Sequence, residues 1–275
     1  MDLNTITDIL RPQHRGAMAG WRAGDAWLAG GTWLFSEPQP ALSRLIDLGG
    51  FGWPAAVVSP EGLEIGATCT VAALDALALP PEWAAAPLFD QCCRAFLASF
   101  KIWNMATVGG NLCMALPAGP MISLTAALDG VCTVWQPDGD QRRVAVTDFV
   151  LGPQRTALRP GELLRSIWLP AKALTQRTAF RKISLTPLGR SAALVIGTVG
   201  RDGGFALTIT ASTFRPIQLR FPAPPSKVAL RESIEANIPD SQYFDDPHGA
   251  PVWRKHMTRQ LAEDIRLELG PGATP

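Results

Sequence analysis

The sequence predicts an α+β protein. Three observations indicate this class: short apolar segments bounded by Gly or Pro, two Ala-rich segments with apolar residues at helical spacing, and neighbouring apolar segments joined by Gly-containing turns. The chain has 275 residues, 47% of them hydrophobic, which is enough to build a substantial core. Lys and Arg number 25 against 24 Asp and Glu, and the net charge of +1 leaves no surplus to neutralise a nucleic-acid backbone. Nucleic-acid binding as the main function is therefore excluded.

The first part of the chain predicts several short strands and two helices. Short apolar segments that end in Gly or Pro are typical of strands, and longer Ala-rich segments with helical spacing are typical of helices. The turn Pro137-Asp138-Gly139-Asp140 separates two segments that form a predicted hairpin. The predicted strands are 27–29, 45–48, 63–67, 131–135 and 143–146, and the predicted helices are 70–79 and 84–98.

A smaller second part is predicted beyond residue 170, where the apolar patterning lapses and resumes near residue 178. It contains two predicted antiparallel strands, 192–199 and 205–212, joined by a turn with two glycines, then a Pro-rich linker and a closing helix at 252–269. In that helix an apolar residue recurs every fourth position, which places one apolar face toward the core. The residues of that face are Trp253, Met257, Leu261 and Ile265.

The cysteines argue against a disulfide framework and against a metal site in this chain. Their number is odd, and none stands in a C-x-x-C pair that would hold zinc or an iron–sulfur cluster. We expect small buried thiols at Cys69, Cys92, Cys93, Cys113 and Cys132.

Targeting signals are absent from the sequence. The N-terminal segment carries Asp8 and Arg11 and lacks the apolar centre of a signal peptide, and no apolar run approaches the ~20 residues that a membrane span needs. We therefore expect a cytoplasmic protein with no membrane span.

Two glycine pairs are the segments most indicative of a binding function. They are Leu28-Ala29-Gly30-Gly31-Thr32 and Ala106-Thr107-Val108-Gly109-Gly110-Asn111. A glycine pair beside a hydroxyl residue can expose consecutive backbone N–H groups to a pyrophosphate, because no Cβ blocks the approach. Either pair alone could be a tight turn, but two of them favour a dinucleotide. Neither matches the G-x-G-x-x-G fingerprint or the phosphate loop G-x-x-x-x-G-K-[ST].

These two segments also carry a family resemblance. Together with 102–113 as a whole and the stretches 63–67, 149–153, 158–164, 179–182 and 245–256, they resemble the FAD subunits of the molybdenum hydroxylases, the xanthine dehydrogenase and carbon monoxide dehydrogenase family. The resemblance covers nearly the whole chain. It implies a vanillyl-alcohol-oxidase (PCMH)-type FAD-binding domain at 1–172, made of two α/β subdomains (about 1–55 and 56–172), and a smaller C-terminal α+β domain at 173–275.

The resemblance also implies which residues bind FAD. The segment from Leu28 to Leu34 would wrap the diphosphate, the second segment would complete the cradle, and two leucines and a lysine would lie near the cofactor. The implied cofactor-binding residues are Leu28, Ala29, Gly30, Gly31, Thr32, Trp33, Leu34, Thr107, Gly109, Gly110, Asn111, Leu163, Leu164 and Lys182. Core packing for the leucines and a solvated surface position for Lys182 are the competing interpretations.

Two positions depart from the family pattern. Pro120 stands where similar proteins carry an Asp that binds the cofactor, and a proline side chain accepts no hydrogen bond. Trp33 stands where a small or polar residue is common; we interpret it as a packing residue, and stacking on an aromatic ring of the ligand is the alternative.

No catalytic or metal-binding side chains are predicted. The three histidines, His14, His248 and His256, are scattered, and Asp245-Asp246 is typical of a turn before the closing helix. The resemblance therefore implies that a cofactor does the chemistry. FAD would take electrons from two-iron two-sulfur clusters on a small partner subunit, in a complex with a large molybdopterin subunit, and pass them to NAD, oxygen or another acceptor.

The expected assembly is a dimer of heterotrimers. Two alternatives stay open. One is a diverged, non-redox structural subunit that keeps the fold and binds FAD weakly, as Pro120 would favour. The other is an autonomous FAD oxidase of the same fold, disfavoured because no acid or base for a substrate pocket stands out.

Overall fold

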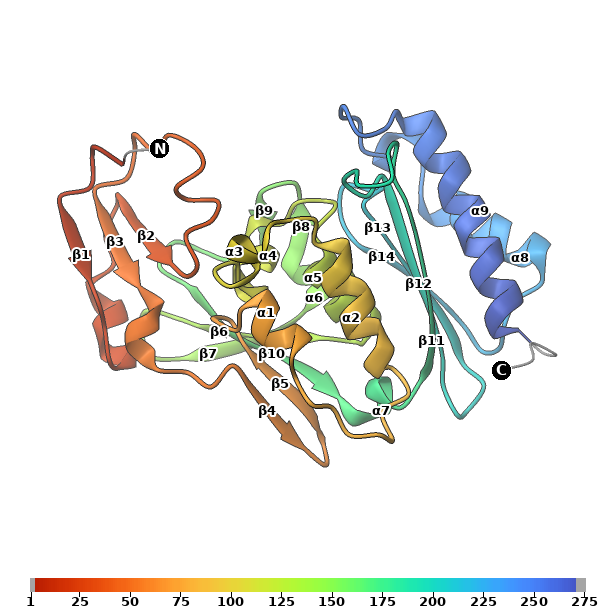
Figure 1. The fold of residues 1–275 in the computed structure, drawn as a ribbon, viewed down its shortest axis with the longest axis horizontal. Helices are drawn as coiled ribbons and strands as arrows, with labels where there is room; N and C mark the ends of the chain where they lie inside the picture. The colour runs from red at the N-terminus through yellow and green to blue at the C-terminus, as the bar shows by residue number, and fades with distance from the viewer. Residues whose placement is uncertain (1–2, 271–275) are drawn as a thin grey trace.

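The computed structural model describes residues 3–270, and the α+β class is confirmed. Figure 1 shows three units in chain order: a small parallel sheet, a larger antiparallel sheet covered by short helices, and a second antiparallel sheet flanked by two long helices. The N-terminal and C-terminal units lie at opposite ends of the molecule, with the helix-covered unit between them.

The N-terminal unit is a three-stranded parallel sheet in the order β1-β3-β2. Its elements are β1 (Asp8–Leu10), η1 (Arg15–Gly20), β2 (Asp25–Leu28), β3 (Arg44–Asp47) and η2 (Leu48–Phe51). The strands predicted at 27–29 and 45–48 correspond to β2 and β3. The exposed strand β1 carries no apolar pattern that would have predicted it.

A buried ion pair joins β2 to β3. The Arg44 guanidinium donates to both carboxylate oxygens of Asp25, at 2.8 and 2.5 Å, and also to the carbonyl of Gly20 at 2.8 Å. The Asp25 side chain is 0% exposed, so the charges are held away from water. The two residues lie opposite each other in the β2–β3 register, and the pair fixes that register and attaches η1 to the sheet.

We expect Asp25→Asn to lower the free energy of unfolding by about 3 kcal/mol at pH 7, because it leaves Arg44 without its charged partner. The hydrogen bonds from Arg44, with the backbone N–H of Arg22, hold the pKa of Asp25 below its usual range. A carboxylate whose pKa is lower in the folded state stabilises the fold fully above its unfolded pKa of about 3.9 and loses that contribution as pH falls further. The difference in unfolding temperature between wild type and Asp25→Asn should therefore be constant above about pH 5 and shrink below about pH 4.

Asp90→Asn is the matched control for this prediction. Asp90 pairs with Arg94 on the exposed surface of one helix, where both side chains are more than 60% exposed and an ion pair contributes little. If the difference in unfolding temperature between wild type and Asp25→Asn persists unchanged down to pH 3, the carboxylate charge is not what stabilises the sheet.

The middle unit is built on a five-stranded antiparallel sheet in the order β4-β5-β10-β6-β7. The strands are β4 (Ala56–Ser59), β5 (Gly62–Gly66), β6 (Val131–Trp135), β7 (Gln141–Ala145) and β10 (Leu163–Pro170), and β8 (Val150–Gly152) and β9 (Arg155–Thr156) form a separate small hairpin. The helices are α1 (Val71–Asp75), α2 (Ala86–Ala95), α3 (Phe100–Trp103), α4 (Val108–Met114), α5 (Pro120–Ala127), α6 (Val146–Phe149) and α7 (Ala171–Leu174).

Both predicted helices of this unit are shorter than expected. The helix predicted at 70–79 ends at Asp75, several residues before Pro80, and Ala76 leaves it with a ψ of 0°. The helix predicted at 84–98 spans only Ala86–Ala95, and Phe96 leaves it with a non-helical ψ of 85°. The apolar residues beyond these helix ends pack against the core or line a pocket instead.

The C-terminal unit is a four-stranded antiparallel sheet in the order β11-β12-β13-β14. Its elements are β11 (Arg177–Ile183), β12 (Ala193–Val199), β13 (Phe205–Thr210), β14 (Ile217–Phe221), α8 (Lys227–Asn237), η3 (Asp240–Gln242) and α9 (Pro251–Leu269). Helices α8 and α9 lie on one side of the sheet, and α2 and α5 of the middle unit lie on the other (Figure 1).

One hydrophobic core joins the middle and C-terminal units. All eight residues of α5 are buried, and Leu194 and Ile196 of β12 belong to the same core cluster as β5 and β10. The Ser123 and Thr210 hydroxyls also meet at 2.7 Å across this contact. The boundaries near residues 55 and 172 stay predictions; they fall before β4 and within α7.

The buried face of α9 includes Leu261 and Ile265 as predicted, but it differs from the predicted face in the first half of the helix. Trp253 and Met257 lie at its edge, and the buried residues one position further along are Arg254 and Thr258. Arg254 is 1% exposed and donates to the carbonyls of Gly249, Ala192 and Ala211 and to the Asp246 carboxylate. An arginine on a buried face is possible because backbone oxygens that would otherwise lack donors surround it. Asp246 thus belongs to a turn, as its sequence position predicts.

Candidate functional site

The first loop, residues 28–34, follows β2 directly. Gly31 has a φ of +68°, and the carbonyls of Gly31 and Trp33 accept hydrogen bonds from Phe35 and Ser36. Within the described residues 3–270, no backbone N–H from Gly30 to Leu34 donates to a protein acceptor. Five consecutive backbone donors without a protein partner are available to an anion, and runs of backbone N–H groups can bind one.

The second loop, residues 104–111, is held against the segment that follows β5. Val108 N–H donates to the carbonyl of Cys69 at 2.8 Å, and Gly109 N–H donates to that of Ala67 at 3.0 Å. The Thr107 hydroxyl accepts from Gly110 N–H at 3.0 Å and caps α4. The loop therefore ends as the first turn of a helix, which the glycine pair did not predict because glycine is a poor helix former.

The two loops touch at Gly30. A Cβ on this residue would lie 1.6 Å from the carbonyl oxygen of Met105, so the backbones approach more closely than any side chain allows. The tertiary structure thus brings together the two glycine pairs that the sequence singled out, as a single site.

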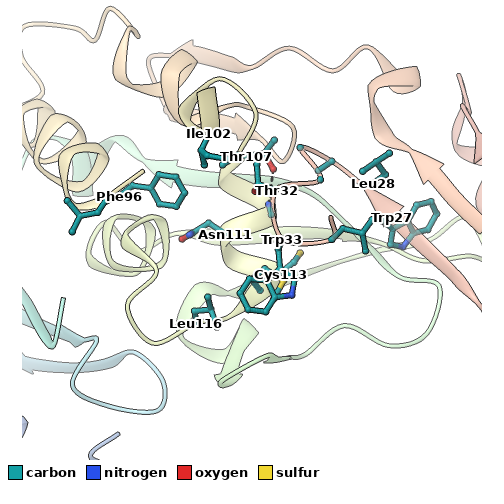
Figure 2. A pocket seen from close by; sticks show the side chains of 18 of the residues that line it. Trp27, Leu28, Thr32, Trp33, Phe96, Ile102, Thr107, Asn111, Cys113 and Leu116 are labelled. Carbon is teal, nitrogen blue, oxygen red and sulfur yellow. Dashed lines mark hydrogen bonds between the residues drawn. The ribbon is translucent and has the colours of Figure 1, made fainter. Parts of the chain in front are cut away.

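A pocket of about 400 Å³ lies between the loops. Figure 2 labels ten of its residues, which come from β2 and the first loop, from Phe96 after α2, from α3, and from α4 with the residues on either side of it. The lining is mostly apolar, with a few hydroxyl and amide groups, as is usual for small-molecule sites. It consists of Trp27, Leu28, Ala29, Gly30, Gly31, Thr32, Trp33, Leu34, Phe96, Leu97, Ile102, Ala106, Thr107, Gly110, Asn111, Cys113, Met114, Leu116 and Arg190.

Most of the residues predicted to bind a cofactor line this pocket. All seven of the first loop do so, as do Thr107, Gly110 and Asn111. Gly109 is buried, and a Cβ there would lie 2.5 Å from Ala67 Cβ, so its position serves the packing of α4 on the segment after β5. Their roles in cofactor binding stay predictions.

Leu163, Leu164 and Lys182 do not line the pocket. Leu163 packs beneath the first loop in a cluster that includes Trp27, and Leu164 belongs to the main core. Lys182 lies on β11, opposite Leu194. Their assignment as cofactor ligands also stays a prediction, and for the leucines the packing that the structure shows is the competing interpretation.

Asn111 links the pocket to α5. Its side-chain oxygen accepts from Met121 N–H at 3.2 Å, which leaves the side-chain NH₂ as the group available to a ligand. Pro120 is buried as the first residue of α5 and does not line the pocket. The departure from the family pattern at position 120 therefore leaves the pocket lining unchanged.

Glu162 supports the first loop from the other side. Its carbonyl accepts from the Trp27 indole N–H at 3.0 Å, and its carboxylate accepts from Arg142 at 3.0 and 2.6 Å. The hydrogen bonds from Arg142, with the backbone N–H of Arg159, hold the pKa of Glu162 below its usual range, so the carboxylate is ionised at neutral pH. Trp27 is thus fixed by a group that belongs to the start of β10.

Trp33 and Trp103 differ in environment. Trp103 packs on the core, and its indole N–H donates to the carbonyl of Phe96. Trp33 is half-buried, lines the pocket and belongs to none of the core clusters formed by the described residues. Trp33 is therefore available to a ligand in the pocket, as the stacking alternative requires.

All five cysteines are free thiols, four of them buried as expected. Cys113 lines the pocket, and burial raises its pKa to about 12, so its sulfur is a neutral thiol and a poor nucleophile. Among residues 3–270, no group of three or more His, Cys, Asp or Glu side chains could hold a metal ion, and no helix is long and apolar enough to cross a membrane.

Sequence reasoning missed several lining residues. Phe96 and Leu97 were expected inside a helix, and Met114 and Leu116 follow the second glycine pair without a distinguishing pattern. Arg190 comes from the C-terminal unit, and nothing in its local sequence links it to the glycine pairs. Only the docking of the two sheets brings it to the pocket.

A pocket that two glycine pairs enclose, with a row of backbone donors that have no protein partner, defines a dinucleotide-binding protein. Residues 18–172, more than half of the chain, match the family described as the FAD binding domain in molybdopterin dehydrogenase. The chain belongs to this family.

Curated relatives agree with this membership. The carbon monoxide dehydrogenase medium chain of Afipia carboxidovorans is 30% identical over 190 residues, which cover 66% of this chain and 63% of the relative. Xanthine dehydrogenase 2 of Arabidopsis thaliana is 28% identical over 119 residues, which cover 41% of this chain but only 9% of the relative. The match thus spans under two thirds of the medium chain and a small part of the much longer xanthine dehydrogenase.

Solved structures share the fold over nearly the whole chain. Reconstituted CO dehydrogenase from Oligotropha carboxidovorans superposes with a TM-score of 0.81 at 23% identity, over 96% of this chain and 97% of that one. Quinoline 2-oxidoreductase from Pseudomonas putida 86 gives 0.79 at 19% identity, over 99% of both chains. The expected PCMH-type FAD-binding fold with its C-terminal domain is confirmed.

Proposed function

We propose that this chain binds FAD in the pocket between the two loops and acts as the electron-transfer flavoprotein subunit of a molybdenum hydroxylase. The observation that carries the proposal is the row of five backbone N–H groups, from Gly30 to Leu34, without a protein acceptor in the described chain. Buried or half-buried N–H groups require an acceptor, and the oxygens of a diphosphate supply several in a row. The glycines leave the row free of Cβ atoms where the ligand would approach.

Other pocket residues would hold the cofactor around this row. The Thr107 hydroxyl accepts from Gly110 N–H and keeps its own proton to donate, and Asn111 offers its side-chain NH₂. Trp33 lines the pocket, and Phe96, Leu97 and Ile102 supply apolar surface for the remainder of a large ligand. The pocket lining does not include the other three predicted ligands, Leu163, Leu164 and Lys182.

FAD supplies the chemistry of such a site, because a bound flavin accepts electrons one at a time and releases them as a pair. The protein's own contribution is binding, orientation and exclusion of water. The Cys113 thiol stays protonated beside the pocket, and the carboxylates of Asp25 and Glu162 are tied to arginines away from it. No described side chain lining the pocket is therefore placed to act as an acid or base, in keeping with an electron-transfer role.

The partners follow from the same assignment. The relative in Afipia carboxidovorans is a medium chain of carbon monoxide dehydrogenase, a name that belongs to an enzyme of several chains. We expect a small subunit with two-iron two-sulfur clusters to deliver electrons and a large molybdopterin subunit to oxidise the substrate, in a dimer of heterotrimers. NAD or oxygen would be the external acceptor.

The alternative of a non-redox structural subunit was favoured by Pro120. That residue is buried at the start of α5 and lies outside the pocket lining. A structural subunit would also have no need for a pocket lined by unpaired backbone donors.

Spectroscopy of the purified full chain tests the proposal. We expect the visible absorption bands of oxidised flavin, and one FAD per chain released by denaturation and identified as FAD rather than FMN by chromatography. A protein stripped of flavin should regain these bands when FAD is added. A colourless chain that takes up no FAD would contradict the electron-transfer function and favour the structural alternative.

A further inference from the structure

Arg190 is the one charged residue among those that line the pocket. It is exposed, and within residues 3–270 it takes part in no ion pair and no side-chain hydrogen bond. By contrast, Arg44 forms an ion pair with Asp25, and Arg142 forms one with Glu162. Arg190 therefore brings a positive charge, with free donors, to the edge of an otherwise neutral pocket.

The position of Arg190 is set by the C-terminal unit. It lies in the connection between β11 and β12, outside the segment 18–172 that matches the FAD-binding family. The residues that follow it, Ser191 and Ala192, are 3% and 0% exposed, and Ala192 both donates to the carbonyl of Ile183 and accepts from Arg254. The backbone at Arg190 is thus anchored at the sheet while its side chain reaches into solvent at the pocket edge.

The charge has an obvious complement in the proposed ligand. A diphosphate carries two negative charges, and the first loop and second loop offer it only neutral donors. Guanidinium groups bind phosphate oxygens with two parallel hydrogen bonds, which are stronger than bonds from neutral donors. The apolar residues around the pocket lower the local dielectric and strengthen such an ion pair relative to one in open solvent.

We infer that Arg190 binds the diphosphate of FAD, so that the C-terminal unit completes the cofactor site. This inference rests on the proposed function. It assigns the β11–β12 connection a role in holding the cofactor, with the FAD-binding unit supplying neutral backbone donors and the C-terminal unit supplying the charge.

Binding measurements on the flavin-free full chain test this inference. We expect Arg190→Gln to raise the dissociation constant for FAD roughly tenfold or more, from the loss of charge-assisted hydrogen bonds. Affinity for riboflavin, which has no phosphate, should stay unchanged, and Arg190→Lys should fall between. Raising the salt concentration should narrow the difference between wild type and Arg190→Gln, because salt screens exposed charges.

Arg201→Gln is the matched control. Arg201 is exposed on the β12–β13 turn of the same sheet and, within the described residues, also has no ion pair, but it lies outside the pocket lining. The dissociation constant of the Arg201→Gln variant for FAD should equal that of wild type. Wild-type FAD affinity in Arg190→Gln, or an equal loss of riboflavin affinity, would overturn the role of Arg190 while leaving FAD binding intact. A wild-type chain that binds no FAD would overturn the proposed function as well.

Discussion

Gly30→Ala is expected to raise the dissociation constant for FAD by at least about 100-fold, equivalent to about 3 kcal/mol. The added Cβ would lie 1.6 Å from the carbonyl oxygen of Met105 and 2.6 Å from its carbonyl carbon. Both are backbone atoms, so no side-chain rotation relieves the clash, and the first and second loops must move apart. The row of N–H donors and the Thr107 hydroxyl would then no longer face one ligand. Titration of the flavin-free chain with FAD, followed by flavin fluorescence, measures the effect.

Gly20→Ala is the control for this substitution. Gly20 precedes β2 by a few residues, and a Cβ there would meet no atom within 4 Å. We expect unchanged FAD affinity and an unchanged unfolding temperature for this variant. If Gly30→Ala retains FAD as wild type does, the two loops do not form one binding site, and the proposal of a diphosphate bound between them fails.

The adjacent glycines of the second pair are expected to give opposite results. Gly110→Val should abolish FAD retention, because the larger side chain would occupy the pocket, and it should cost less stability than a change at Gly109, because a Cβ at Gly110 meets only the Thr107 hydroxyl, at 2.9 Å. Gly109→Ala should instead destabilise the fold by about 1–3 kcal/mol, because its Cβ would lie 2.5–2.7 Å from the Cβ, carbonyl oxygen and Cα of Ala67.

Thermal unfolding and flavin content, measured on both variants, separate these two roles. Gly110→Val should be colourless, and Gly109→Ala should unfold at the lower temperature of the two. Gly110→Ala, which adds a single methyl group, should weaken FAD binding less than the valine does. Full flavin content in Gly110→Val would remove Gly110 from the cofactor cradle.

The elements that the sequence predicted best are those whose signal is local. The hairpin at 131–146 and the strands at 192–199 and 205–212 agree with β6, β7, β12 and β13, because short apolar segments and the Gly-containing turns between them encode these strands directly. β10, the central strand of the middle sheet, was not recognised as one strand, since it pairs with β5 and β6 through contacts far apart in the sequence. On α9, Arg254 occupies the face where the apolar period predicted Trp253.

In the site, too, the features with a local sequence signal could be predicted, and those that depend on contacts between distant residues could not. The two glycine pairs could be recognised from sequence, because a residue without a Cβ has the same consequence for backbone approach wherever it lies. Nothing local distinguishes Gly109 from Gly110, yet one packs on Ala67 and the other lines the pocket. The helical start of the second loop was also hidden, because burial of Val108 and Leu112 outweighs the low helix propensity of the two glycines.

By itself the sequence determined the α+β class and singled out the two glycine pairs, because these depend on residue type and short-range spacing, and the resemblance of the same segments to a known family indicated the family. The tertiary structure alone decided that Gly30 touches Met105, that Leu163 and Leu164 pack away from the pocket, and that Arg190 reaches it. These contacts join residues far apart in the chain. They arise from the docking of one sheet on another through a shared apolar core, and that geometry has no signature in any single segment.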